Sequence, residues 1–149
     1  MTVAEDKGEQ REEVRDPEVV EPVLDLYLRL FLEYLEQQKE GEAGFSITLV
    51  TSGGVVSGTA VTRAAYLKGI DVSLRSAGGN GGEPAAEFFS RMIEHLDSMP
   101  VPEQGHQFPR WIHLQDARVV AGDQTLRFPQ WRGRLADVAG WSFGFVSEA

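Results

Sequence analysis

The chain has 149 residues, of which 42% are hydrophobic, and a formal net charge of −9. This length and composition predict one globular domain with a packed core and some length left for a tail or insertion. Cysteine is absent, which excludes disulfide bonds and thiolate metal sites and fits a reducing cytoplasm. The first residues lack the apolar run of a signal peptide. The longest apolar stretch, residues 24–35, carries three charged residues and is a poor membrane span.

The negative charge is concentrated at the N-terminal end. Residues 1–42 hold 13 acidic and 5 basic residues, whereas residues 110–134 carry five arginines. Residues 1–15 are charged and poor in apolar groups, which predicts a disordered acidic arm ahead of a single domain over residues 16–149. An acidic arm and a basic strand region on one chain can attract each other between copies, and a solvated surface is the alternative for these charges.

A helix is predicted after this arm. Asp16 and Pro17 are typical of a helix start, but Pro22 favours a regular beginning near Glu21, and the helix then runs to about Lys39. Apolar residues recur along it at helical spacing, and four further leucines add apolar surface beyond that stripe. The stripe comprises Val20, Val23, Leu24, Tyr27, Phe31, Tyr34 and Leu35. The excess indicates either deep burial or a second face for a partner or another copy.

Two strands joined by a tight turn are predicted over residues 45–61. Apolar and polar residues alternate from Phe45 to Val50, and Gly53 and Gly54 mark the turn. Gly58 lies inside the second strand, where a glycine indicates a bend or a bulge.

The remaining residues predict an inserted helix and three more strands. A glycine loop precedes a helix from Pro84 to Met99, within an insertion over about residues 75–109. Strands follow at residues 110–120, 126–135 and 141–146, with turns at Gly122-Asp123 and Ala139-Gly140. The predicted class is α+β, with an N-terminal helix, a strongly bent five-stranded antiparallel sheet or barrel, and a helix inserted between strands two and three. This order resembles the Sm-like fold.

Patterns that carry catalysis or bind cofactors are weak in this sequence. The GGNGG loop lacks the lysine and hydroxyl residue of a P-loop. The three histidines, His95, His106 and His113, share no metal-ligand spacing. We therefore predict no cofactor and no metal; an enzyme using His113 and Asp116 stays as an alternative.

Three blocks of the sequence resemble signature blocks of the gas vesicle accessory protein U family (GvpU). They are FSITLVTSGGVVSGTAV at residues 45–61, WIHLQDARVV at residues 111–120 and WRGRLADVAGWSFG at residues 131–144. The resemblance implies a non-catalytic, cytoplasmic and bacterial protein that acts in gas vesicle assembly or clustering. It would do so by self-association, as a homo-oligomer, and by contacts with vesicle shell or other accessory proteins.

Two sets of residues are predicted to matter for this role. Glycines that shape turns or bends are Gly53, Gly54, Gly58, Gly133 and Gly140. Candidate contact residues are Trp111, Trp131, Arg132, Arg134 and Trp141. Core packing is the alternative for the tryptophans. An Sm-like RNA-binding protein is the alternative function, with Trp131 and Arg132 stacking on a base, although the acidic net charge opposes phosphate binding.

Overall fold

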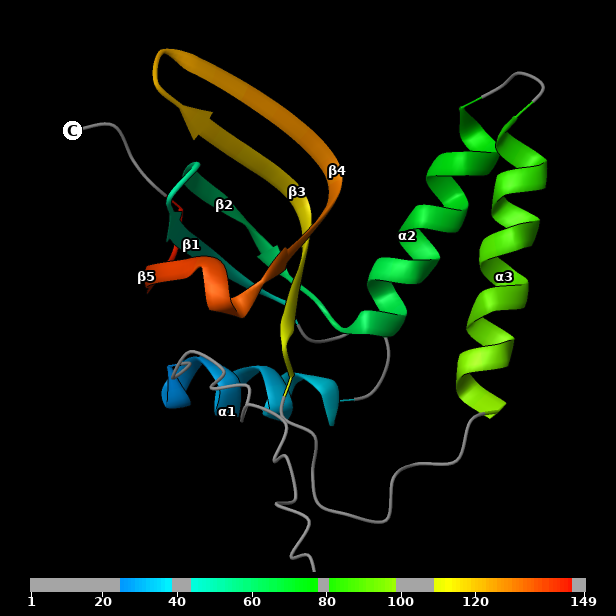
Figure 1. Cartoon of the computed structure of the whole chain (residues 1–149), viewed down its shortest axis with the longest axis horizontal. Coiled ribbons are helices and arrows are strands. Elements are labelled where there is room, and N and C mark those ends of the chain that lie inside the picture. Colours follow the sequence, from blue (N-terminus) through cyan, green and yellow to red (C-terminus); the bar gives the residue numbers. More distant parts are fainter. Residues whose placement is uncertain (1–24, 39–43, 78–80, 99–108, 146–149) are drawn as a thin grey trace, which may run out of the picture.

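The computed structural model describes residues 25–38, 44–77, 81–98 and 109–145. Its elements run along the chain as three helices and five strands (Figure 1). They are α1 (Leu26–Glu36), β1 (Phe45–Thr51), β2 (Gly54–Ala60), α2 (Arg63–Ser76), α3 (Gly82–Ser98), β3 (Trp111–Ala121), β4 (Gln124–Arg134), the short 3-10 helix η1 (Leu135–Asp137) and β5 (Val138–Phe143). The predicted α+β class, the N-terminal helix and a helix between the second and third strands are confirmed. The acidic arm and the predicted helix start at Asp16 lie outside the described residues.

The five strands form one antiparallel sheet in the order β4-β3-β2-β1-β5. The sheet is not closed, because β4 and β5 stay at its two ends instead of pairing with each other. The predicted antiparallel sheet is therefore present, but the barrel is not. Two sheet edges result, a long one on β4 and a shorter one on β5.

Helix α1 begins at Asp25, whose side chain accepts a hydrogen bond from the Leu28 amide at 3.1 Å, as expected for an N-cap. The helix buries Leu28, Leu32 and Leu35. Tyr27 and Tyr34, which the sequence pattern predicts on the buried stripe, are instead 78% and 61% exposed. The leucines are wholly apolar and fill the core, whereas a tyrosine keeps its hydroxyl in water on the outer face.

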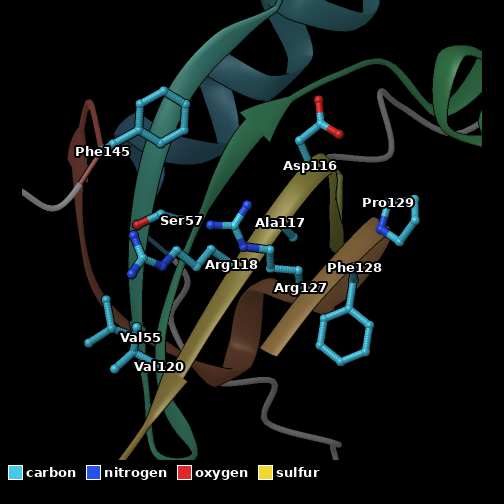
Figure 2. A pocket seen from close by; sticks show the side chains of 10 residues that line it. All are labelled: Val55, Ser57, Asp116, Ala117, Arg118, Val120, Arg127, Phe128, Pro129 and Phe145. Carbon is cyan, nitrogen blue, oxygen red and sulfur yellow. The ribbon is translucent and has the colours of Figure 1, made fainter. Parts of the chain in front are cut away.

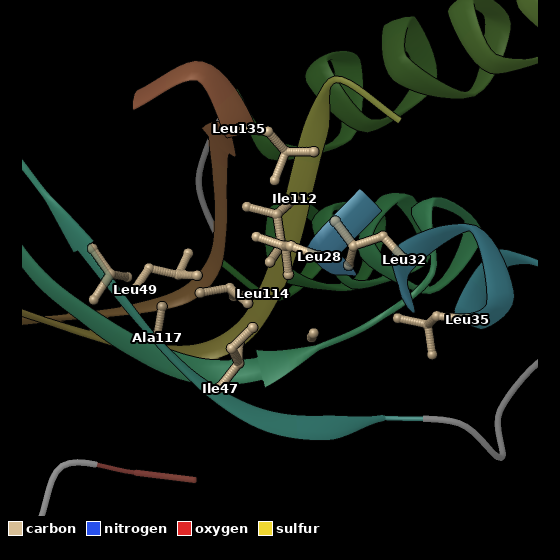
Figure 3. Close-up of a cluster of buried hydrophobic side chains, with 11 residues drawn as sticks. Leu28, Leu32, Leu35, Ile47, Leu49, Ile112, Leu114, Ala117 and Leu135 are labelled. Carbon is tan, nitrogen blue, oxygen red and sulfur yellow. The ribbon is translucent and has the colours of Figure 1, made fainter. Parts of the chain in front are cut away.

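The core lies between α1 and one face of the sheet (Figure 3). The three leucines of α1 meet Ile47 and Leu49 of β1, and Ile112, Leu114 and Ala117 of β3, with Leu135 of η1 at its margin. Each fully buried aliphatic side chain of this kind stabilises the fold by roughly 1.5–3 kcal/mol. We call this side of the sheet the core face, and the opposite side the outer face.

Helix α2 covers part of the outer face. The Ser73 hydroxyl donates to Oε1 of Gln130 at 2.8 Å, and the Gln115 side-chain amide donates to the Ala65 carbonyl at 3.4 Å. The sequence pattern assigns no helix to these residues. The helical segment between β2 and β3 therefore begins earlier than predicted, at Arg63 instead of within the insertion that starts near residue 75. No α2 side chain is buried, which explains why its apolar periodicity is weak.

Strand β3 contains a bulge opposite Gly58. Ser57 pairs with Arg118 and Thr59 with Gln115, so β3 has one residue more than β2 between these pairs. Asp116 takes the left-handed backbone conformation there, with φ of 51°. A Cβ on Gly58 would lie 3.1 Å from the Gln115 carbonyl oxygen, a tight contact that favours glycine at this position.

The last turn differs from the prediction. Ala139 and Gly140 lie within β5, where Gly140 pairs with Val50, and η1 instead connects β4 to β5 at the other end of the sheet order. The Leu135 amide donates to the Arg110 carbonyl at 2.9 Å, which anchors η1 beside the start of β3.

Candidate interaction surfaces

The predicted contact residues divide between the two faces of the sheet. Trp111 and Arg132 come together on the outer face, where the guanidinium carbon of Arg132 lies 4.0 Å from the centroid of the Trp111 ring. This is a cation–π contact at a surface where Trp111 stays 37% exposed. The pair stands at the rim of a cleft of about 770 Å³ between α1, α2, α3 and β3.

Trp131 points to the core face instead. It pairs with Leu114 and packs, half-buried, against the core cluster. Gly133 follows two residues later on the same face, and a Cβ there would collide with the Trp131 ring. This glycine therefore makes room for the indole, which packs against the core cluster.

Arg134 and Trp141 also have partners within the chain. The Arg134 guanidinium makes a two-point contact with the Asp137 carboxylate, at 2.9 and 3.1 Å, across η1. The Trp141 indole nitrogen donates to Asp25 at 3.1 Å. The hydrogen bonds that Asp25 accepts, first from the Leu28 amide and then from the Trp141 indole, lower its pKa. The start of α1 is thereby tied to β5.

An aromatic cluster extends from this contact. The ring of Phe143 lies 5.1 Å from Trp141, 5.0 Å from Phe31 and 5.6 Å from Phe45, measured between centroids. Phe143 remains 53% exposed, so the cluster reaches the surface at the β5 edge. It joins α1 to the sheet and leaves an apolar rim beside that edge.

The outer surface of α1 carries a second apolar stripe, which we call the α1 stripe. It consists of Leu26, Tyr27, Leu30 and Tyr34, exposed by 55%, 78%, 47% and 61%. Helical spacing places these side chains together on the face opposite the buried leucines. A contiguous apolar face of this kind is typical of a protein contact site. Of the four leucines beyond the predicted stripe, Leu28 and Leu32 are buried and Leu26 and Leu30 are exposed, so the excess apolar surface is divided between the core and the exposed side of the helix.

The sheet has a further hollow on the part of its outer face that α2 leaves uncovered (Figure 2). Its volume is about 660 Å³, and Arg118 and Arg127 line it together with Val55, Val120 and Phe145. Both arginines belong to the basic strand region of residues 110–134, but they were not predicted to form a site. The Gly122-Asp123 turn would have allowed this prediction, because a two-residue hairpin turn places Arg118 opposite Arg127.

His113 and Asp116 are not brought to one site. His113 is buried against Tyr66, 4.7 Å between ring centroids, and lines the α1–α2 cleft, whereas Asp116 lines the hollow on the open part of the sheet. Burial, followed by the charges of Arg132 and Arg63, lowers the pKa of His113 to about 4. Among the described residues, no group of three or more histidine, cysteine or acidic side chains is placed to hold a metal ion.

Comparison with known proteins decides the family. A model of the family described as "Gas vesicle protein GvpU-like" matches residues 25–146, which is most of the chain. The chain belongs to the GvpU-like family. The matched range begins at the N-cap of α1 and includes every described element, so the family region and the fold coincide. No curated protein and no solved structure matches the chain. Within the described part of this GvpU-like chain, no helix is long and apolar enough to cross a membrane.

Proposed function

We propose that this GvpU-like chain is a non-catalytic, cytoplasmic gas vesicle accessory protein. It acts in vesicle assembly or clustering by self-association and by contacts with shell or other accessory proteins. The observation that carries this proposal is the α1 stripe, an apolar and aromatic helix face that the fold leaves exposed. Family membership supports the gas vesicle context.

The α1 stripe has the symmetry that a pair of copies needs. Tyr27 and Tyr34 lie on either side of Leu30, so the stripe reads similarly from both ends of the helix. Two antiparallel copies would set each Tyr27 against the other copy's Tyr34. A two-fold interface requires such a self-complementary surface.

The size of the stripe predicts weak association. The 11 residues of α1 span about 16 Å, and one face of such a helix offers well under the roughly 800 Å² per partner of a stable interface. Additional contacts are needed for a stable assembly, and the β4 and β5 edges with their unpaired backbone groups supply them. Pro129 within β4 has no amide hydrogen, so pairing along that edge is interrupted at this point.

The test is the size of the purified chain as its concentration is raised. The proposal expects sedimentation coefficients that increase with concentration and increase further when gas vesicles are added. A chain that stays monomeric at every concentration and leaves the vesicles unbound contradicts the proposal.

RNA binding is the second candidate, and the stack of Arg132 on the exposed Trp111 is the observation that favours it. The net charge of −9 opposes it, because phosphate binding relies on an excess of basic groups. A salt-sensitive mobility shift of labelled RNA at about micromolar protein, typical of non-specific phosphate binding, would favour this candidate over the first.

A further inference from the structure

A polar row crosses the whole outer face of the sheet. Successive cross-strand pairs place Ser142 beside Thr48, Thr48 beside Ser57, Ser57 beside Arg118 and Arg118 beside Arg127. The hydroxyls at one end satisfy each other, with 2.9 Å between Thr48 Oγ1 and Ser57 Oγ and 2.7 Å from Thr48 Oγ1 to the Gly144 carbonyl. Arg118 and Arg127, at the other end of the row, do not satisfy each other by hydrogen bonds in this way.

Arg118 and Arg127 face each other directly, which is unfavourable for two like charges on neighbouring strands. Within the described part of the chain, neither guanidinium forms an ion pair. Asp116 also lines the hollow and offsets only one of the two positive charges. The hollow therefore favours an anionic group lying between the arginines.

Apolar side chains flank this charged pair. Val55 and Val120 are neighbours on the outer face in the row beside the arginines, and Phe145 lies over the same hollow (Figure 2). Val120 and Phe145 are 37% and 61% exposed. A ligand that fits both features carries carboxylates and aliphatic side chains close together, as an acidic peptide segment does.

We propose that the acidic N-terminal segment of the same chain, residues 1–24, binds this hollow. The segment holds eight acidic residues against three basic ones, and its aliphatic residues stand among the acids. The acids are Glu5, Asp6, Glu9, Glu12, Glu13, Asp16, Glu18 and Glu21. Charge and apolar content therefore both match the hollow.

The segment is long enough to reach the hollow. It joins the fold at Asp25, which Trp141 holds at the β5 end of the sheet. Four strand spacings of about 4.8 Å separate β5 from β4, and passing to the outer face adds about 10 Å, which gives a path near 30 Å. An extended chain covers that path in about nine residues at 3.3 Å each. Asp16 and the acids before it can therefore lie at the arginines.

Attachment to the same chain favours this segment over that of a second copy. A tethered segment whose reach matches its site has an effective concentration of about millimolar, well above a protein at micromolar concentration. Binding within the chain would cover the open half of the outer face and compete with any partner that uses it. This inference does not rest on the gas vesicle role.

The absence of cysteine makes a direct test simple. A nitroxide attached to Gln10→Cys in the full-length chain broadens the NMR signals of nearby nuclei. At low salt we expect severalfold broadening of the Val55, Val120 and Arg127 amides, with the α3 amides unaffected. At about 1 M NaCl, where the Debye length is about 3 Å, the broadening is lost.

Two variants separate the binding site from general charge effects. Arg118→Gln with Arg127→Gln removes the broadening, whereas Arg75→Gln with Arg91→Gln, the same charge change on α2 and α3, leaves it in place. Glu12→Gln, Glu13→Gln and Asp16→Asn together weaken it without altering the described fold. If the arginine variant does not fold, the variant with three neutralised acidic residues still tests binding of the segment to the hollow.

Mixing a nitroxide-labelled chain with an isotope-labelled chain that has no nitroxide shows which copy binds. At a protein concentration below that of self-association, binding within one chain gives no broadening of the Val55, Val120 and Arg127 amides in the mixed sample. Broadening in the mixture overturns the proposal in favour of a second copy. Absence of broadening at low salt in the singly labelled chain overturns the binding site itself.

Discussion

Gly58 is a residue where a Cβ would be in tight contact with the neighbouring strand. It opposes the β3 bulge, and a Cβ would lie 3.1 Å from the Gln115 carbonyl oxygen, 3.2 Å from the Leu114 Cβ and 3.3 Å from the Ala117 Cα. Leu114 and Ala117 are buried in the core and Gln115 is half-buried, so these neighbours have little freedom to move aside. The bulge, in turn, brings Ala117 onto the core face and Arg118 onto the outer face.

We predict that Gly58→Ala lowers the free energy of unfolding by about 1–3 kcal/mol, the usual cost of overpacking a tight site. Gly140→Ala in β5 is the matched control, since a Cβ there meets nothing within 4 Å. Its effect should be small. Denaturant unfolding of both variants measures the difference, and equal stabilities would contradict the assigned role of Gly58.

His113 makes stability depend on pH. Its pKa falls from the ordinary value of 6.5 to about 4, because burial and then Arg132 and Arg63 disfavour the charged form. The unfolded chain binds a proton below pH 6.5, and the folded chain does so only near pH 4. The contribution of His113 to the free energy of unfolding is therefore fully present above pH 6.5 and is lost as the pH falls towards 4.

The expected loss is at most on the order of 3 kcal/mol between these pH values. His113→Gln should flatten this part of the stability profile, even though it removes the contact with Tyr66. The exposed His95 of α3 provides the control, and His95→Gln should keep the slope. Unfolding midpoints recorded from pH 7 to pH 4 give the answer; a slope that survives in His113→Gln would refute the assignment.

Among the elements, α1 has two functional faces on one short helix. Its leucines hold the core, and the α1 stripe is exposed and is the contact surface that we propose. We predict that Tyr27→Glu with Tyr34→Glu weakens self-association at least severalfold, because each interface would then bring four carboxylates together. Phe88→Glu on α3, an aromatic residue exposed to 63%, is the matched control.

Analytical ultracentrifugation over a concentration series measures this effect. The tyrosine variant should stay smaller than the wild-type chain, and Phe88→Glu should match the wild type. Unfolding curves confirm that the variants keep the fold. If the tyrosine variant associates as strongly as the wild type, α1 is not the contact.

The strands and the inserted α3 were predictable from sequence, whereas α2 was not. Alternation from Phe45 to Val50 predicts β1 because one face of that strand is buried. Helix α2 buries no side chain, so its pattern carries little periodicity, and the Thr62 N-cap is its main local signal. The β5 start was misplaced because Gly140, a turn residue by composition, lies in a strand beside Val50.

The positions of the candidate contact residues were only partly predictable for a related reason. Trp111 and Arg132 were both identified from sequence, but their stacking depends on the β3–β4 register. Trp131 could not be assigned to the core face without knowing where α1 packs. Arg118 joins Arg127 and Ser57 on the outer face only because the bulge adds one residue to β3.

At the scale of the whole molecule, an open sheet has helices on both faces, and the described residues leave several surfaces exposed. They include the α1 stripe, the edges on β4 and β5, and the hollow on the outer face. The aromatic cluster and the Asp25–Trp141 hydrogen bond make α1 and β5 one rim. We place the proposed contacts with other copies and partners on these surfaces.

Co-flotation with gas vesicles tests the central claim most directly. Gas-filled vesicles rise during centrifugation and carry bound protein with them. We predict that the wild-type chain and Phe88→Glu appear in the floating layer, whereas Tyr27→Glu with Tyr34→Glu is depleted from it. Recovery of folded wild-type chain entirely below the vesicles, at concentrations where it associates with itself, would contradict the proposed role.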